Sequence, residues 1–397
     1  MLQSIFFWTW VLLQLLVGYH LVFPFFLFLF HLIVPKKKTE ASTNSSVASY
    51  AIIVTAFEQT TGLHAVVNSL LQLNYTDYLI YLVADKCDVS GLHFNDERVI
   101  VLRPEEPLCS NTRSHFYAIR HFRQPHERLT IIDSDNLVKP DYLQQLNVFF
   151  DKGFKAVQGI RNAKNLNTEL ACLDAARDIY YHYYDGALLF GVGSSATLSG
   201  SGMAFTTALY QDCLGKKDVT GAGFDKVLQA EILKRDQRIA FTENAIVYDE
   251  KTSRSDQLVN QRSRWINTWF KYFFLGFDIL FMGIKNFSFN QFLFGLVLLR
   301  PPLFIMLGLG FFLMVLNLFI YPVISVFWLI GFALFVTGFT IALLHSKTDK
   351  RIYKSLVNIP TFIFYQVISL FNARNANKRS IATKHYHHTD VEDITTK

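Results

Sequence analysis

Long apolar stretches at both ends of the chain flank a central segment in which apolar and polar positions alternate. Residues 2–34 contain no Asp, Glu, Lys or Arg. As a helix they would extend roughly 50 Å, which exceeds the bilayer hydrocarbon core of about 30 Å. A single helix, tilted or kinked near Pro24, fits this length better than two crossings. The run is too long for a cleaved signal peptide, so we predict an N-terminal transmembrane helix over residues 1–35.

A second apolar block covers residues 292–344 and is interrupted by prolines. Its length predicts a pair of transmembrane helices joined by a tight turn at Tyr321-Pro322. Residues 352–371 are also long enough to span a membrane. Basic residues flank this segment on both sides, including Arg351 and Arg374, and we therefore expect it to be interfacial or re-entrant.

The remaining connecting segments complete the predicted membrane topology. Residues 36–47 form a basic and polar linker that opens with three lysines, which places the following domain in the cytoplasm. We expect interfacial helices over residues 266–291. The interfacial or re-entrant segment and a polar tail, together residues 345–397, should lie on the cytoplasmic side.

The central segment, residues 48–265, alternates short β-branched runs with amphipathic stretches. The pattern predicts a helix over residues 64–73. Short apolar runs predict buried strands over residues 51–54, 78–83, 99–102 and 129–132. Alternating strands and helices predict an α/β domain with a mostly parallel sheet and helices on both faces. Ligands of such sheets bind beyond the carboxyl ends of the strands.

Charge and cysteine usage exclude some classes of function. The formal net charge is +6, and basic residues cluster beside apolar runs, which favours lipid headgroups over nucleic acid. The 4 cysteines show no metal-binding spacing and are typical of free thiols in a reducing compartment.

Asp133-Ser134-Asp135 follows the apolar run of residues 129–132 and therefore lies at a strand end. Two carboxylates there suit Mg²⁺ or Mn²⁺ holding a diphosphate, although a solvated acidic turn has the same sequence. Asp85 ends another predicted strand in the same way.

Asp225 follows Gly221-Ala222-Gly223-Phe224 and begins a predicted helix. A carboxylate in the first helical turn serves as a cap, or, kept ionised by the helix dipole, as a general base. Both interpretations fit the residues alone.

The segment Gln261 to Trp265 lies where the soluble segment meets the apolar one. On a helix, Gln261, Arg264 and Trp265 share one face, and Arg262 and Ser263 should point elsewhere. An amide, a guanidinium and an indole on one face suit a phosphorylated sugar ligand. A simple membrane anchor is the alternative interpretation.

Taken together, four segments of the chain resemble the membrane-bound family-2 glycosyltransferases of the cellulose synthase and hyaluronan synthase group. Residues 84–88 resemble the uracil-binding segment of that group, and Asp133-Ser134-Asp135 resembles its D-x-D motif. Gly200-Ser201-Gly202 resembles the loop beneath the acceptor, and Gln261 to Trp265 matches Q-x-x-R-W in full. The resemblance covers roughly residues 48–270 and implies a GT-A fold.

The resemblance also implies roles for individual residues. Asp85 would contact uracil, Asp133 the nucleoside, and Asp135 the metal ion, while Asp225 would be the catalytic base. The donor-binding residues implied are Ala56, Glu58, Asp85, Arg113, Asp133, Ser134, Asp135, Gln261 and Arg264. The acceptor-binding residues implied are Gly200, Ser201, Gly202 and Trp265.

The sequence departs from the family pattern at two of these places. Phe224 stands where an acidic residue usually precedes the base, and residues 110–118 lack a Gly-Lys pair, for which Arg113 would substitute.

The implied activity is inverting, Mg²⁺- or Mn²⁺-dependent transfer of a sugar from a UDP-sugar at the cytoplasmic face of a bacterial inner membrane. A growing polysaccharide, extended processively and exported, is the first acceptor to expect. A lipid acceptor, such as a polyprenyl phosphate, a diacylglycerol or a ceramide-like molecule, is the alternative, and an inactive scaffold is a third hypothesis. The residues do not predict an oligomeric state.

Overall fold

The computed structural model describes residues 2–34, 47–374 and 376–379. The linker up to residue 46, with its three lysines, and the tail from residue 380 lie outside the described residues.

Eight strands form one sheet in the order β3-β2-β1-β4-β7-β6-β8-β5. They are β1 (Tyr50–Phe57), β2 (Tyr78–Asp85), β3 (Val99–Leu102), β4 (Arg128–Asp133), β5 (Leu137–Val138), β6 (Ala156–Ala163), β7 (Met203–Thr206) and β8 (Ile239–Asp249). Strands β3, β2, β1 and β4 are parallel neighbours, as are β6 and β8, whereas β7 is antiparallel to both β4 and β6. The four predicted strands and the mostly parallel α/β sheet are confirmed.

Helices cover both faces of this sheet, as the sequence predicts. They are α2 (Leu63–Leu71), α3 (Asn111–Arg120), α4 (Tyr142–Phe150), α5 (Glu169–Tyr181), α6 (Leu189–Gly191), α7 (Thr207–Leu214) and α8 (Phe224–Lys234). Alternate residues of β1 enter different cores: Ala51 and Ile53 pack on one side, Ile52 and Val54 on the other. This two-sided burial explains why the strands are continuous apolar runs.

Eight further helices lie outside the sheet layers. They are α1 (Leu2–Ile33), α9 (Ser255–Tyr272), α10 (Phe274–Lys285), α11 (Phe289–Leu298), α12 (Leu303–Ile320), α13 (Pro322–His345), α14 (Lys350–Ser355) and α15 (Ile359–Asn372). Residues 182–188 form a π-helical turn between α5 and α6, and short 3₁₀ turns cover residues 356–358 and 376–379.

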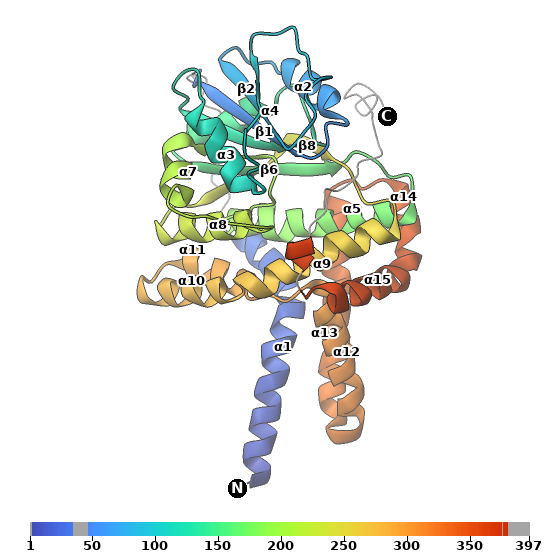
Figure 1. Ribbon diagram of the computed structural model, residues 1–397. Helices are drawn as coiled ribbons and strands as arrows, with labels where there is room; N and C mark the ends of the chain where they lie inside the picture. Colours follow the sequence, from blue (N-terminus) through green and yellow to red (C-terminus); the bar gives the residue numbers. More distant parts are fainter. Residues whose placement is uncertain (1, 35–46, 375, 380–397) are drawn as a thin grey trace.

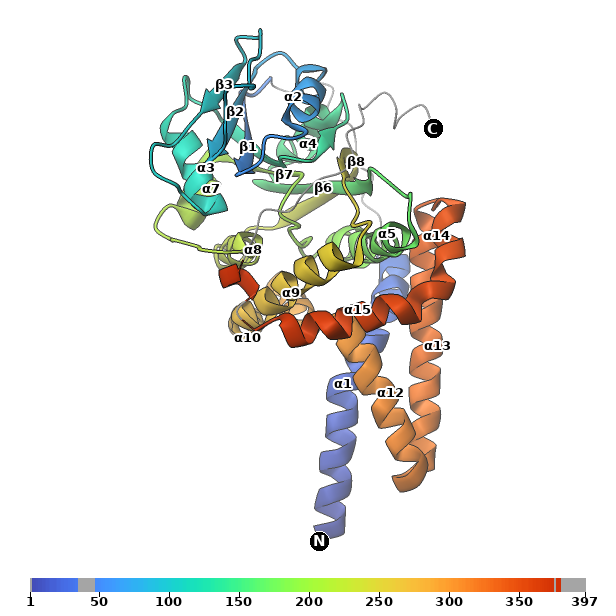
Figure 2. The same cartoon turned by 45° about the vertical axis from the view of Figure 1, so that its right-hand side comes forward.

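Figures 1 and 2 show α1, α12 and α13 projecting in the same direction from the α/β domain, with α9 and α15 lying across them. Each of the three is long and apolar enough to cross a membrane, and residues 350–372 qualify as a fourth segment by the same measure. Because α15 lies across the other spans, the interfacial placement of residues 352–371 stays our prediction for that segment.

Polar side chains connect the projecting helices to one another. Gln14 Oε1 of α1 accepts hydrogen bonds from Asn317 Nδ2 of α12 at 3.0 Å and from Trp328 Nε1 of α13 at 2.6 Å. Within apolar surroundings such bonds satisfy groups that lipid cannot solvate. Helix α11, which precedes α12 in the chain, is a separate helix that packs against α10. The first helix of the predicted pair therefore begins at Leu303 rather than near residue 292, because Pro301-Pro302 interrupts the chain.

Candidate functional site

A cavity of about 870 Å³ lies between the carboxyl ends of the strands and the helices that follow the domain. It brings together residues that are far apart in the sequence. The predicted residues that line it are Asp133, Ser134, Asp135, Gly200, Asp225, Gln261, Arg264 and Trp265. The main segments singled out from the sequence thus converge on one site.

The loop that contains Ser201 holds the backbone at the start of the D-x-D motif. The Ser201 hydroxyl accepts hydrogen bonds from the Asp133 backbone N–H at 3.0 Å and from Asn136 Nδ2 at 2.9 Å. The Gly202 N–H donates to the Ile131 carbonyl, 3.0 Å away. Ser201 is fully buried and, with Gly202, lies beneath the motif, whereas Gly200 reaches the cavity.

Four of the predicted donor-binding residues are not among the residues lining the cavity. Asp85 is 2% exposed, and its carboxylate accepts hydrogen bonds from the Leu108 and Cys109 backbone N–H groups. Glu58 and Arg113 form ion pairs with neighbouring side chains. Ala56 is buried within β1. Of this region, Thr55, Phe57, Gln59 and Asn111 do line the cavity.

The carboxylates of the D-x-D motif fit a divalent cation whose remaining coordination positions are filled by the substrate. In the part of the chain that the structure describes, no group of three or more His, Cys, Asp or Glu residues forms a metal cluster. Asp133 and Asp135 nevertheless both line the cavity. Mg²⁺ in such sites is held by one or two carboxylates and by substrate phosphates rather than by an all-protein cage. The D-x-D pair has the donor set for that arrangement.

Asp225 lies in the first turn of α8, which begins after Gly223. Gly223 has φ +102°, and a Cβ at this position would come within 2.7 Å of Tyr272 Cε2 on α9. A glycine is therefore required where α8 begins against α9. The carboxylate of Asp225 is largely buried and lies 3.8 Å from Lys226 Nζ.

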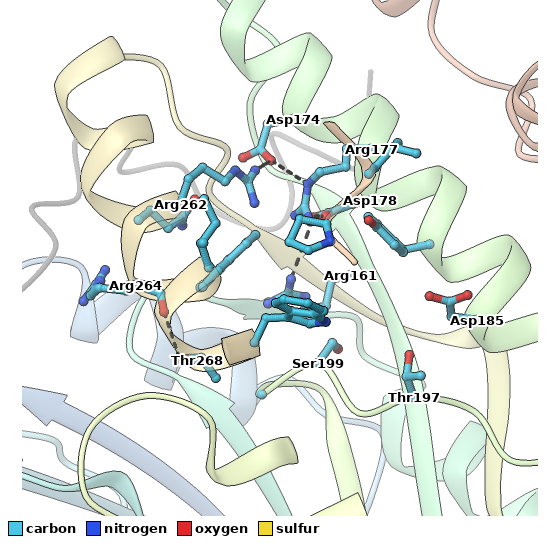
Figure 3. A pocket seen from close by; sticks show the side chains of 18 of the residues that line it. Arg161, Asp174, Arg177, Asp178, Asp185, Thr197, Ser199, Arg262, Arg264 and Thr268 are labelled. Carbon is cyan, nitrogen blue, oxygen red and sulfur yellow. Dashed lines mark hydrogen bonds and ion pairs between the residues drawn. The ribbon is translucent and has the colours of Figure 1, made fainter. Parts of the chain in front are cut away.

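Helix α9 carries Gln261, Arg264 and Trp265 on the cavity wall, as the spacing predicts. Gln261 Oε1 accepts a hydrogen bond from Thr252 Oγ1 at 3.2 Å. The expectation that Arg262 points elsewhere is wrong, because Arg262 also lines the cavity and pairs with the buried Asp174 of α5. Figure 3 shows this pairing. The i, i+3 spacing of Arg262 and Trp265 is the sequence signal that would have placed them together.

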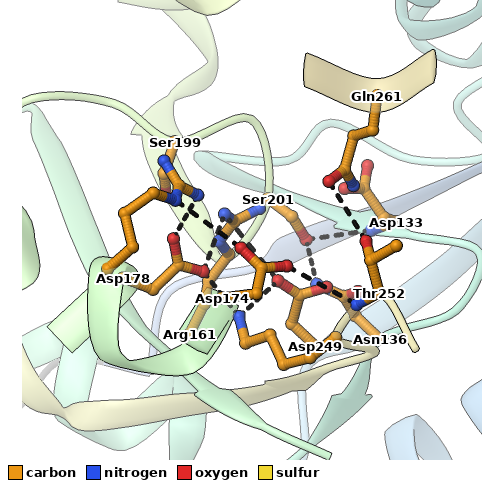
Figure 4. A network of polar contacts seen from close by, with 12 residues as sticks. Asp133, Asn136, Arg161, Asp174, Asp178, Ser199, Ser201, Asp249, Thr252 and Gln261 are labelled. Carbon is orange, nitrogen blue, oxygen red and sulfur yellow. Dashed lines mark hydrogen bonds and ion pairs between the residues drawn. The ribbon is translucent and has the colours of Figure 1, made fainter. Parts of the chain in front are cut away.

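A buried network of charges forms part of the cavity wall. Lys251 Nζ lies 2.6 Å from Asp178 Oδ2 and 2.9 Å from Asp249 Oδ2, and Arg161 is within 4 Å of both aspartates. Figure 4 shows this network beside Asp133, Asn136 and Ser201. No local sequence pattern predicts this network, since its pairing depends on contacts between β6, α5 and β8.

Opposing effects set the pKa values in this network. Burial by itself would raise the pKa of Asp178, but Arg177, Lys251 and Arg161 outweigh it and hold that pKa well below its usual range. Burial likewise lowers the pKa of Arg161, and Asp249, Asp178, Asp133 and Asp135 together raise it above its ordinary value. The D-x-D carboxylates therefore face a fixed positive charge.

His182 lines the cavity at the start of the π-helical turn. Burial lowers the pKa of His182 to about 3. Its imidazole is therefore neutral at physiological pH.

Comparison with known proteins identifies the class of the domain. Residues 48–268, more than half of the chain, match the family described as glycosyltransferase-like family 2. The chain is a family 2 glycosyltransferase. Among curated proteins, no sequence matches this glycosyltransferase significantly.

A solved structure supports this assignment at the level of fold. The mannosyltransferase PcManGT from Pyrobaculum calidifontis, in complex with GDP-Man and Mn²⁺, has a TM-score of 0.58 at 14% identity, covering 92% of this chain and 97% of its own. S. aureus TarS residues 1–349 give a TM-score of 0.40 at 14% identity, with coverage of 83% and 90%. The GT-A-like fold predicted for this glycosyltransferase is confirmed.

Proposed function

We propose that this glycosyltransferase transfers a sugar from a UDP-sugar to an acceptor carried by a membrane lipid, at the cytoplasmic face of a bacterial inner membrane. One observation carries the proposal. The cavity that contains Asp135 and Asp225 continues without a break to apolar side chains of the projecting helices. These apolar lining residues include Phe304 and Leu307 of α12 and Phe335 and Phe339 of α13, and Phe362 of the crossing helix α15 lines the cavity as well.

A cavity with a charged end and an apolar end matches the two parts of a glycolipid. The polar end offers carboxylates, guanidiniums and an indole to sugar and phosphate groups. The apolar end is lined from helices long enough to cross the membrane, where an acyl or prenyl chain enters without leaving lipid. A soluble acceptor would not need this second end.

The residues at the polar end supply the chemistry of an inverting displacement. Asp225 accepts the proton of the acceptor hydroxyl, whose oxygen forms a bond to the anomeric carbon. The bond from that carbon to the UDP oxygen breaks, and the electron pair leaves with UDP. Arg264, on the same cavity wall, stabilises the charge of the departing diphosphate.

Asp135, with Asp133 beside it, would hold a Mg²⁺ or Mn²⁺ ion. When bound, the ion neutralises charge on the diphosphate. Arg161 lines the same cavity, and its positive charge is close enough to Asp133 and Asp135 for both carboxylates to raise its pKa.

We also propose that the chain belongs to the cellulose synthase and hyaluronan synthase group. Its proposed domains and segments are residues 1–35, 36–47, 48–265, 266–291, 292–344 and 345–397. Helix α9 continues through residue 265 to Tyr272, so the catalytic domain and the first interfacial segment share one helix. The cytoplasmic orientation rests on the lysines at the start of the linker.

A growing polysaccharide is the second candidate acceptor, and the position of Trp265 favours it. This indole is 36% exposed on the cavity wall, so part of the ring stays open to a sugar residue of an acceptor chain beside Arg177 and Arg262. Under this hypothesis the same cavity would pass the polymer toward α12 and α13.

The test uses the purified full chain in lipid nanodiscs with Mn²⁺, labelled UDP-sugars and GDP-mannose. Crude membrane lipid extract serves as the acceptor source. Label that partitions into organic solvent supports the lipid acceptor, and water-soluble label of high molecular mass supports the polysaccharide. If no donor is consumed with any lipid or saccharide, transferase activity itself is contradicted.

A further inference from the structure

Three arginines and two aromatic residues on the cavity wall form a continuous stack. The Arg262 guanidinium lies over the Trp265 ring at 4.1 Å, and Arg177 lies over the same ring at 4.6 Å. Arg177 also lies 5.4 Å from the centre of the Tyr181 ring, and Arg300 is 5.3 Å from it. All five side chains line the cavity. We call these five residues the arginine ladder.

The ladder connects the catalytic end of the cavity to the beginning of the membrane helices. Arg262 and Trp265 belong to α9 beside Gln261 and Arg264. At the other end, Arg300 directly precedes Pro301-Pro302 and α12. Arg300 is held there by an ion pair with Asp185 of the π-helical turn. A molecule that reaches from Asp225 to the apolar end of the cavity passes this row of cations.

Arg262 keeps hydrogen-bonding capacity that no described residue uses. Its side chain is buried, with 3% exposure, and Nη2 pairs with Asp174. Its Nε and Nη1 have no hydrogen-bond partner among the described residues. Leaving N–H groups of a buried cation unpaired is unfavourable unless a ligand accepts their hydrogen bonds.

The positive charge of Arg262 is matched by nearby carboxylates, whereas its hydrogen-bonding capacity is not fully used. Burial lowers the pKa of Arg262 to about 10 and the neighbouring charge of Arg177 lowers it as well, while Asp174 and Asp178 act in the opposite direction. The two guanidiniums that share the Trp265 ring pair with two carboxylates, those of Asp174 and Asp178. A bound anion would accept the hydrogen bonds that Nε and Nη1 of Arg262 do not make to the described residues.

We propose that the arginine ladder binds the phosphate or diphosphate group that links the acceptor's sugar to its lipid. The inference rests on the proposed function, and it narrows the acceptor to lipid-phosphate-linked sugars. Phosphate oxygens match the planar N–H pairs of arginine, which uncharged diacylglycerol or ceramide headgroups do not. The phosphate lies at the ladder, the lipid chain lies among α12, α13 and α15, and the sugar hydroxyl faces Asp225.

The donor diphosphate is the other source of phosphate in this enzyme, and the experiment must separate the two. Farnesyl diphosphate, farnesol, inorganic diphosphate and UDP are titrated separately against the full chain in nanodiscs, with binding measured by calorimetry. The variants are Arg262→Gln and Arg177→Gln. Arg120→Gln, at the exposed end of α3, is the matched control.

The wild type should bind farnesyl diphosphate at least tenfold more tightly than farnesol or inorganic diphosphate, since charge-assisted bonds add to burial of the chain. In both ladder variants this preference over farnesol should fall to within about twofold, with UDP affinity unchanged. The Arg120→Gln control should keep the full preference.

Arg262→Gln removes the nearest cation from the buried Asp174 carboxylate, which would destabilise the fold. The double variant Asp174→Asn/Arg262→Gln also removes the carboxylate charge and so avoids this destabilisation. If the double variant folds and keeps the farnesyl diphosphate preference, the proposal is wrong. Equal binding of farnesol, equal binding of inorganic diphosphate, or loss of UDP affinity in the ladder variants also overturns it. A retained preference with no sugar transfer to any lipid contradicts the proposed function and leaves the phosphate site standing.

Discussion

Lys251 Nζ lies 2.6 Å from Asp178 Oδ2, and both side chains are buried under the polar end of the cavity. Replacing Lys251 with Met removes the buried cation that pairs with both Asp178 and Asp249, and leaves the two carboxylates to share Arg161 at longer distances. We expect the variant to lose about 3–5 kcal/mol of stability, measured by denaturant unfolding in detergent micelles. Lys139→Met, which breaks the more exposed Lys139–Asp141 pair, should change stability by about 1 kcal/mol or less.

The same network predicts how that stability difference depends on pH. The pKa of Asp178 is held below its unfolded value of 3.8, so its contribution is present above that value and disappears as pH falls through the folded pKa. The pKa of Lys251 is raised above 10.5, so its contribution is lost only at still higher pH. The wild type should therefore exceed Lys251→Met by a constant margin from about pH 6 to 9, and the margin should shrink below about pH 4. A margin that changes sharply near pH 7 would contradict this account.

Ser201→Ala tests whether the loop beneath the D-x-D motif positions the aspartates. The substitution removes the acceptor of hydrogen bonds from the Asp133 N–H and from Asn136. We expect a loss of about 1–3 kcal/mol in stability and a weaker metal-dependent affinity for UDP. Ser201→Thr retains the hydroxyl, and if it folds it should recover UDP affinity. Unchanged UDP affinity in a folded Ser201→Ala protein would show that the loop does not position the motif.

Gly223→Ala tests the close approach of α8 to α9. A methyl group at this residue meets Tyr272 and Thr268 and requires a left-handed backbone that alanine disfavours. We expect a destabilisation of roughly 1–3 kcal/mol and a lower kcat, because Asp225 moves with the start of α8. Gly91→Ala, where a Cβ meets nothing within 4 Å, should leave both quantities nearly unchanged. Normal turnover in the Gly223→Ala protein would mean that the start of α8 tolerates displacement.

Asp225→Asn keeps the size of the side chain and removes its ability to accept a proton. We expect kcat to fall by about 10²–10⁴, while UDP-sugar affinity stays within about twofold. Asp236→Asn, at an exposed turn after α8, should retain wild-type turnover. Near-normal turnover of Asp225→Asn would assign the base to another residue.

Asp135→Ala removes a carboxylate expected to hold the divalent ion. UDP binding in the presence of Mn²⁺ should weaken by roughly tenfold or more, and binding in EDTA should match the wild type. If Mn²⁺ strengthens UDP binding equally in both proteins, the ion is held elsewhere.

The sequence predicts the sheet well because strands that are buried on both faces consist of continuous runs of apolar residues. The ends of those runs place Asp133 and Asp135, and helical spacing places Gln261 and Trp265. Contacts between distant elements are less visible in the sequence. The pairing of Arg262 with Asp174 depends on how α9 crosses α5, and nothing local in either segment specifies that crossing. The family resemblance names Asp85, but only the structure shows its carboxylate engaged by backbone N–H groups.

Because one cavity joins the polar site to the projecting helices, the detergent used to extract the protein from the membrane would compete with the natural acceptor for binding. A surfactant monomer with a headgroup at Trp265 and an alkyl tail beside Phe339 would fill the same space. Purification in a short-chain surfactant should thus inhibit sugar transfer without unfolding the protein, and transfer into phospholipid should restore the activity.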